Sequence, residues 1–387
     1  MTYRNAMKSC ALALGTAVLA TAAIAQDGPI KVGVILPMSG GGAYVGEGIY
    51  AGVDLAVKQV NEAGGVLGRQ LQVLLRDEQL RPDVSTAAMR ELITLEGVQH
   101  FIGPATSATS LANSQIAREE KVVNISPSAK TEALTAGDNL HDYIFQLAPT
   151  TDVDGVRTVE VLRGMGTESI CFTGFDYAYT HDWFAAIRAN MGDITEAGEF
   201  LVPMNATDFS ATITQLLSSD CDTIVGTQYG GSFIAFVKQA TPFGLFESKK
   251  VLWGSNTGDH AVAAALGVEL PSGLWASAAD VWYYEGEESH AAYQEALAAY
   301  QGRKETDMWP ITGYNAVKFL AAAIEAAGTT EPTAVAAALE GLTIQTPLGE
   351  ITIDPETNRA NSPEFYGRFE PQEGSDVARM TDLRLVR

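Results

Sequence analysis

Short runs of apolar, mostly β-branched residues alternate with helical segments along most of this chain. The first run covers residues 31–36, stops at Pro37, and leads through Ser39 and three glycines toward a helix expected over residues 50–63. A run that is apolar at every position suits a strand covered on both faces. Because this unit recurs with short connections, the sequence predicts doubly wound parallel sheets with helices on each face.

The alternation occurs in two series. The first series has further strands expected at 71–75, 98–103 and 122–126, and helices at 84–96 and 106–119. The second has helices expected at 153–163, 181–190, 209–218 and 232–240, and strands at 169–173, 200–203, 223–226 and 250–253. After them we expect a strand at 274–283, helices at 289–300, 311–327 and 333–339, and short β segments from 349 onwards. Since each series has its own set of strands, the sequence predicts two lobes instead of one extended sheet.

The glycine-rich turn after the first strand has two interpretations. Ser39, Gly40, Gly41 and Gly42 let the backbone approach a ligand closely, and the N-terminus of a helix follows. Such a turn can hold the phosphate of a nucleotide or the carboxylate of a smaller ligand.

The first 25 residues have the features of a secretory signal peptide. Arg4 and Lys8 precede an uncharged apolar run that ends in Ala23-Ile24-Ala25, so cleavage is expected before Gln26 and the mature protein in the periplasm. An apolar run of about 15 residues is too short to span a bilayer. The formal net charge of −22 disfavours nucleic acid and anionic membrane surfaces as partners.

Cysteine and histidine usage predicts no metal site and no cofactor. Cys171 and Cys221 follow the predicted cleavage site and meet an oxidising compartment, where a disulfide can form. Two buried thiols are the state that we expect. The 5 histidines are scattered singly, and no Cys/His set has the spacing of metal ligands.

The loops at the carboxyl ends of the predicted strands are rich in small and polar residues. In open α/β sheets these ends carry the ligand site. The first series offers hydroxyl groups at residues 106–110 and 126–130, whereas the second offers aromatic and amide groups at 176–179, 228–231 and 255–258. Such facing chemistry suits a small polar molecule with an apolar part, enclosed between lobes.

Several short motifs occur in a characteristic order along the chain. They are Pro37-Met38-Ser39-Gly40, Asn61-Glu62-Ala63-Gly64-Gly65-Val66-Leu67-Gly68, Ile102-Gly103-Pro104, Ser126-Pro127-Ser128-Ala129, Asp176-Tyr177-Ala178-Tyr179 and Pro347-Leu348-Gly349. With this order and spacing the chain resembles the leucine/isoleucine/valine-binding proteins, the solute-binding subunits of branched-chain amino-acid ABC transporters. The similarity covers nearly all of the mature chain.

The resemblance implies the type I periplasmic binding protein fold, with two lobes joined by a hinge of three crossovers near Thr150, Ala279 and Gln345. Residues 26–150 with 280–345 would form the N-terminal lobe, and 151–279 with 346–387 the C-terminal lobe. The implied partners are an amino acid or related small carboxylate and the membrane permease of an ABC transporter. The protein is expected to be a monomer.

Four site residues follow from the resemblance, and two more, Tyr44 and Val45, from the position of the glycine turn beside the expected cleft. Ser107 and the helix N-terminus beside it should hold the ligand carboxylate, and Ser128 falls where the family offers backbone groups. Tyr229 should reach across from the second lobe, Tyr179 should close over the ligand, and Tyr44 with Val45 should shape the apolar side. Each serine could instead cap a helix and each tyrosine could pack at a lobe edge.

Two further positions depart from the amino-acid-binding pattern. Lys130 stands where a threonine usually helps to bind the α-ammonium group, and Asn256 stands where an acidic residue usually pairs with it. Both changes disfavour a bound cation, which leads to the hypothesis of a carboxylate ligand without an α-ammonium group. The alternative is that Lys130 points to solvent and Asp259 or another acid substitutes.

Two other function classes need consideration. Gly40, Gly42 and Gly46 after a strand, with Tyr314 and Lys318, suggest a nicotinamide-dependent oxidoreductase. That class expects an acidic residue at the end of the second strand, about 20 positions past the glycines, whereas this strand ends at Asp77, more than 30 positions past Gly42. No hydrolase motif is present, so we expect no catalytic residues and no enzyme. A ligand sensor of the same fold, acting on a membrane receptor, stays open.

Overall fold

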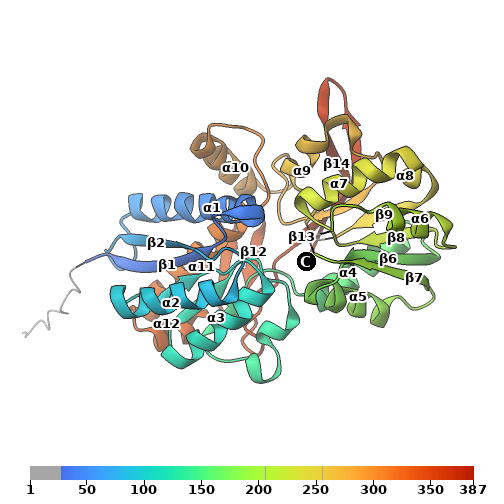
Figure 1. Ribbon diagram of the computed structural model, residues 1–387. Helices are drawn as coiled ribbons and strands as arrows, with labels where there is room; N and C mark the ends of the chain where they lie inside the picture. The colour runs from blue at the N-terminus through green and yellow to red at the C-terminus, as the bar shows by residue number, and fades with distance from the viewer. Residues whose placement is uncertain (1–27, 205, 255) are drawn as a thin grey trace, which may run out of the picture.

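The computed structural model describes residues 28–204, 206–254 and 256–387, which form two α/β lobes lying side by side (Figure 1). The predicted signal peptide, residues 1–25, lies outside the described residues. In the described part of the chain, no helix combines the length and the apolar character needed to cross a membrane.

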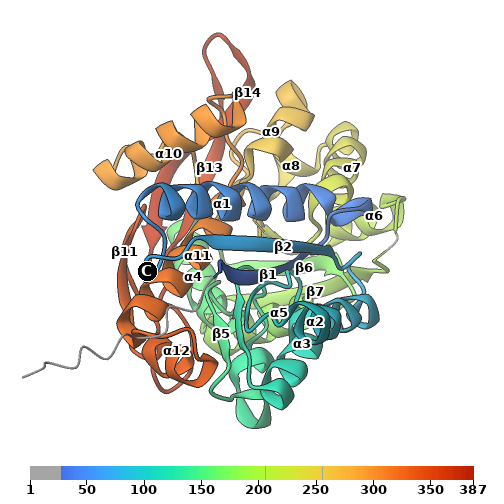
Figure 2. The same ribbon diagram turned by 90° about the vertical axis from the view of Figure 1, so that its left-hand side faces the viewer.

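The first lobe contains a five-stranded sheet in the order β2-β1-β3-β4-β5, with all strands parallel. Its strands are β1 (Ile30–Leu36), β2 (Leu71–Asp77), β3 (His100–Ile102), β4 (Val123–Ser126) and β5 (Ile144–Gln146). Its helices are α1 (Ala43–Glu62), α2 (Pro82–Glu96), α3 (Ser107–Glu120), α10 (Glu288–Gln301), α11 (Pro310–Ala327) and α12 (Pro332–Leu339). The steps from β1 to β2 and from β2 to β3 run in opposite directions, so right-handed crossovers place α1 and α2 on opposite faces (Figure 2).

The second lobe contains a seven-stranded sheet in the order β14-β13-β10-β9-β8-β6-β7. Its strands are β6 (Ser169–Phe175), β7 (Thr195–Val202), β8 (Thr223–Gly226), β9 (Lys250–Trp253), β10 (Trp275–Ala278), β13 (Glu364–Gln372) and β14 (Ser375–Val386). Its helices are α4 (Thr151–Gly164), α5 (Ala178–Asn190), α6 (Ser210–Ser218), α7 (Gly230–Ala240), α8 (Leu245–Ser248) and α9 (His260–Leu266). β6 to β10 run parallel as expected. The tail, expected as short β segments, instead adds two long antiparallel strands at one edge.

The described chain passes between the two lobes three times. The first pass, residues 147–150, leads from β5 to α4, and the second, 279–287, leads from β10 to α10, which packs on α1. The third pass, 361–363, comes later than the crossover expected near Gln345. The reason is that β11 (Thr343–Thr346) and β12 (Gly349–Thr352) pair with each other, and Ala360 then hydrogen-bonds back to Gln146 of β5. The bounds of the lobes given above stay a prediction.

The helix α1 begins at Ala43, seven residues before the start that the sequence predicted. Its first turns contain glycines, which add no apolar side chain to the helical pattern but allow close packing. A Cβ atom at Gly46 would lie 1.9 Å from the carbonyl oxygen of Pro37, and one at Gly52 would lie 1.7 Å from that of Pro310. The glycines therefore seat α1 against the end of β1 and against α11. This packing role weakens the interpretation of the turn as a phosphate-binding motif.

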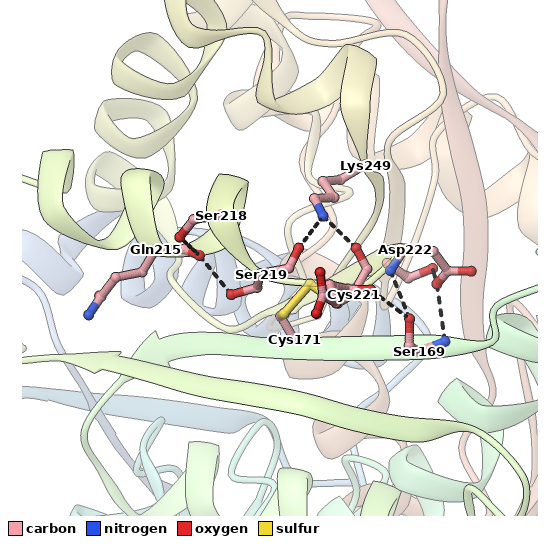
Figure 3. The surroundings of a disulfide bond; sticks show 10 residues. Ser169, Cys171, Gln215, Ser218, Ser219, Cys221, Asp222 and Lys249 are labelled. Atoms are coloured by element: carbon pink, nitrogen blue, oxygen red, sulfur yellow. Dashed lines mark hydrogen bonds between the residues drawn. A yellow bond between two sulfur atoms is a disulfide. The ribbon is translucent and has the colours of Figure 1, made fainter.

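A disulfide joins Cys171 of β6 to Cys221, which precedes the adjacent strand β8 (Figure 3). The expectation of two buried thiols is therefore wrong. The neighbouring strands bring the two Cα atoms to 5.6 Å, a separation within the range that a disulfide spans. Lys249 Nζ donates to the carbonyl oxygens of Ser219 and Cys221 at 2.7 and 2.6 Å, which fixes the segment that carries the second cysteine.

Candidate ligand-binding site

A cleft of about 570 Å³ lies between the lobes, at the carboxyl ends of the parallel strands. Its walls contain residues of both lobes, as the two-lobe interpretation requires. All eight residues predicted for the site line it: Tyr44, Val45, Ser107, Ser128, Lys130, Tyr179, Tyr229 and Asn256. The structure therefore brings together the whole predicted set, although contact with a ligand stays a prediction.

Helix N-termini from both lobes face this cleft. Ala105, Thr106 and Ser107 line it at the start of α3, where Thr106 caps the helix by accepting from the Thr109 N–H at 3.3 Å. Gly230 and Gly231 line it at the start of α7, which has no side-chain cap. The first N–H groups of a helix have no partner inside the helix, and the helix dipole adds partial positive charge there. The cleft therefore favours an anion.

The two predicted serines differ in their environment. Ser107 is the first residue of α3, and its hydroxyl makes no hydrogen bond among the described residues. The hydroxyl of Ser128 donates to the carbonyl oxygen of Ala105 at 2.9 Å. Ser128 therefore ties the loop after β4 to the loop before α3, whereas Ser107 is available to a ligand.

The glycine turn forms part of the cleft wall, and hydrogen bonds to Asp77 hold it in place. The carboxylate of Asp77 accepts from the Met38 N–H at 2.8 Å and from the Ser39 hydroxyl at 2.5 Å. Burial is the largest single influence and opposes ionisation, but the hydrogen-bond donors together outweigh it and lower the pKa of Asp77. Since Ser39 is already engaged, Gly41 and Gly42 contribute to the cleft through their backbone.

Aromatic rings form the apolar side of the cleft. In the second lobe, the Tyr229 ring lies 5.7 Å from Phe175 and 6.4 Å from Tyr177, between ring centroids, in edge and tilted arrangements. In the first lobe, Tyr44 contacts Trp309 edge-on at 6.5 Å. Phe175, Tyr177 and Trp309 were not predicted. Tyr177 shares a loop motif with Tyr179, but nothing in the strand and helix pattern signals Trp309, which precedes α11.

Lys130 follows neither of the two predicted alternatives. Its Nζ donates to Asp154 Oδ2 and to Glu364 Oε1, each at 2.7 Å, and the side chain is buried. Burial opposes the charge on Lys130, but the two carboxylates outweigh it and raise the pKa of the lysine. Arg157 Nη1 lies 3.8 Å from Asp154 Oδ1, which completes a buried cluster of two bases and two acids. Because Asp154 belongs to α4 and Glu364 to β13, Lys130 joins the two lobes.

Neither Asn256 nor Asp259 supplies an acidic side chain to the cleft. Asn256 is buried, its backbone is in the left-handed region with φ at 58°, and its Oδ1 has no hydrogen-bond partner in the part of the chain that the structure describes. Asp259 does not line the cleft and instead caps α9, where burial and the nearby Asp307 carboxylate raise its pKa to about 7. Among the described lining residues there is no Asp or Glu, so the predicted substitution by Asp259 is not what the structure shows.

The described residues hold no group of three or more His, Cys, Asp and Glu side chains arranged to bind a metal. The described lining of the cleft consists of helix ends, aromatic rings and one lysine, whose charge is compensated by Asp154 and Glu364.

Comparisons with known proteins agree with this geometry. The chain is 27% identical over 346 residues to "Leu/Ile/Val-binding protein homolog 8" of Brucella suis biovar 1, covering 86% of this chain and 85% of the relative. It is 24% identical over 352 residues to a leucine-, isoleucine-, valine-, threonine- and alanine-binding protein of Pseudomonas aeruginosa, covering 90% and 92%.

Solved structures include a solute-binding protein of an ABC transporter from Rhodopseudomonas palustris HaA2 in complex with p-hydroxybenzoic acid. Its TM-score is 0.84 at 24% identity, with 93% of this chain and 98% of that chain covered. A branched-chain amino acid transporter substrate-binding protein from Streptococcus pneumoniae, in complex with isoleucine, gives 0.81 at 21% identity, with 91% and 99% covered. These likenesses confirm the predicted two-lobe fold.

The sequence profile of the periplasmic binding protein family matches residues 29–373, nearly all of the described chain. This family consists of binding proteins, so the match supports capture of a solute and contradicts the oxidoreductase alternative. The chain therefore belongs to the periplasmic binding protein family, alongside the leucine/isoleucine/valine-binding proteins.

Proposed function

We propose that this protein captures a small organic acid without an α-ammonium group, in the periplasm, and delivers it to the permease of an ABC transporter. An aromatic carboxylate is the ligand that fits best. One observation carries the proposal: the described residues of the cleft include helix N-termini and aromatic rings from both lobes, but no acidic side chain.

The carboxylate of the ligand would bind at the start of α3. There the free hydroxyl of Ser107 and the first N–H groups of the helix can donate to it. The capless N-terminus of α7 adds positive potential from the opposite lobe. Because helix N-termini can bind the anion, the cleft needs no unpaired basic side chain for this purpose.

An α-ammonium group would lack a partner in this cleft. A buried cation without a counter-charge is costly, and the only charged side chain among the described lining residues is Lys130, which is itself cationic. The carboxylates beside Lys130 are already paired with it. Leucine should therefore bind weakly.

The rings of Phe175, Tyr177, Tyr229 and Trp309 offer stacking and edge contacts to a flat ligand. Two of the similar solved structures are complexes with p-hydroxybenzoic acid and benzoate, and another is a complex with isoleucine. The fold accommodates both classes, so the lining of this particular cleft is what favours the aromatic acid.

Calorimetric titration of the mature protein tests the proposal. Benzoate and 4-hydroxybenzoate should bind, and leucine, isoleucine and valine should not. Ligand at about 100 times its dissociation constant should add about 2.7 kcal/mol of stability, which a melting curve detects. Tight binding of leucine with no binding of the aromatic acids would overturn the assignment of ligand class.

A further inference from the structure

A second, smaller cavity lies behind the cleft, at the hinge. Its volume is about 40 Å³, and its walls include residues from all three passes between the lobes: 147–149, Ala279 and 362–364. Ser128, Lys130, Asn256 and Trp309 line both this cavity and the main cleft. We name the smaller cavity the rear chamber. These four shared residues form the boundary between the rear chamber and the main cleft.

Three buried oxygen atoms in the walls of the rear chamber have no hydrogen-bond partner among the described residues. They are Asn256 Oδ1, Asn315 Oδ1 and Glu364 Oε2. Their residues are 8%, 9% and 2% exposed. Buried polar groups in folded proteins are nearly always hydrogen-bonded, so three such atoms around one cavity need an explanation. As all three are acceptors, the group that complements them is a hydrogen-bond donor.

The charges around the rear chamber favour a neutral donor over a cation. The other oxygen of Glu364 accepts from Lys130, and Asp154 lies between Lys130 and Arg157. Burial and the neighbouring Glu364 raise the pKa of Asp154 to about 8, so Lys130 and Arg157 face one ionised acid near neutral pH, and no net negative charge remains to hold an ammonium group. Lys130 itself lines the chamber and repels a second cation.

We propose that the rear chamber is a hydroxyl-recognition subsite, in which a hydroxyl group of the ligand donates its one proton to Asn315 Oδ1, next to Asn256 Oδ1. The ligand is then a hydroxylated carboxylate whose hydroxyl lies away from the carboxylate bound at α3. One water-sized group needs about 10–15 Å³ of such volume, so a hydroxyl fits in the chamber. The orientation of the ligand rests on the function proposed above, whereas the preference for a hydroxyl rests on the chamber alone.

Ligand pairs that differ in one group test this subsite. We would titrate the mature protein with 4-hydroxybenzoate against 4-methylbenzoate, the corresponding 3-substituted pair, and tyrosine against phenylalanine. In at least one pair the hydroxylated compound should bind about tenfold tighter or more, because a site built to accept a hydroxyl discriminates against an analogue without one.

Asn315→Leu should remove this preference, since it replaces the amide by an apolar group of similar size. The hydroxylated compound should then bind within about twofold of its partner. Asn190→Leu, at an exposed position of α5, is the matched control and should leave the preference unchanged. If Asn315→Leu fails to fold, Asn315→Ala gives the same measurement.

The possible outcomes bear separately on the hydroxyl subsite and on the proposed aromatic-acid ligand. Equal affinities within every pair, or a preference that survives in Asn315→Leu, would overturn the subsite. A preference seen only between tyrosine and phenylalanine would keep the subsite and overturn the aromatic-acid assignment. Binding of none of these compounds would overturn both.

Discussion

Lys130 illustrates how much a single residue can depend on distant segments. From the sequence it was expected to face a ligand or solvent, yet its two carboxylate partners come from residues 24 and 234 positions away. No local pattern signals such an ion pair. The side chain compensates charges in the hinge and does not offer a free charge to the cleft.

Lys130→Met should therefore destabilise the protein by about 3–5 kcal/mol, because it leaves Asp154 and Glu364 buried with only Arg157 beside them. Urea unfolding monitored by fluorescence measures the change. Lys238→Met is the control, since Lys238 and Glu269 form an exposed pair that is worth about 1 kcal/mol or less. A loss no larger than that of the control would show that the cluster does not depend on Lys130.

At the scale of elements, a buried carboxyl joins the end of β2 to the start of α3. Glu78 accepts from the Ala105 N–H at 3.3 Å and from the Ser85 hydroxyl at 3.1 Å. Burial is the main cause that raises the pKa of Glu78 to about 7. The carboxyl therefore supports the segment before Ser107 while it keeps its proton over much of the acidic range.

This raised pKa predicts a pH dependence of stability. The folded protein binds the Glu78 proton more tightly than the unfolded chain, so its contribution is complete below about pH 4.5 and is lost as the pH rises through about 7. The free energy of unfolding should fall across this window by about 1.4 kcal/mol per unit of pKa difference at most.

Glu78→Gln keeps a side chain of the same shape but cannot ionise, and it should flatten this part of the profile. Urea unfolding at a series of pH values, with Glu91→Gln on the exposed side of α2 as control, provides the measurement. An unchanged profile in Glu78→Gln would mean that other groups carry the dependence.

The elements themselves were largely predictable, because apolar runs and their breaks are local. The strands at 223–226 and 250–253 occur where they were expected. β5 was missed since its three residues are too few to show a pattern. Residues 279–283, expected to continue a strand, turn away because the chain passes there to the other lobe. The disulfide was not deduced because pairing depends on which strands become neighbours.

For the whole molecule, capture depends on closure of two lobes around one ligand. A ligand shifts the equilibrium between open and closed forms only by its preference for the closed form, so groups from both lobes must contact it. Tyr44 and Tyr229 line the cleft from opposite lobes, and their contact with a ligand stays a prediction. The resemblance supplied Tyr229, and the glycine turn supplied Tyr44.

Tyr229→Ala should weaken affinity by about tenfold or more and reduce closure at the same time, since it removes the ring that the second lobe presents. Calorimetry gives the affinity, and small-angle scattering with and without 4-hydroxybenzoate gives the closure. Tyr300→Ala, on the exposed side of α10, is the control. Wild-type affinity in Tyr229→Ala would assign the tyrosine to lobe packing alone.

The burial of the hinge cluster determines how the stability of the hinge responds to salt. Dissolved ions screen exposed pairs strongly but reach buried pairs poorly, and the Lys130 side chain is only 9% exposed. The joint between the lobes should therefore keep its strength in dilute and in saline surroundings alike. A change in salt concentration should affect the hinge cluster less than it affects exposed pairs such as Lys238 and Glu269.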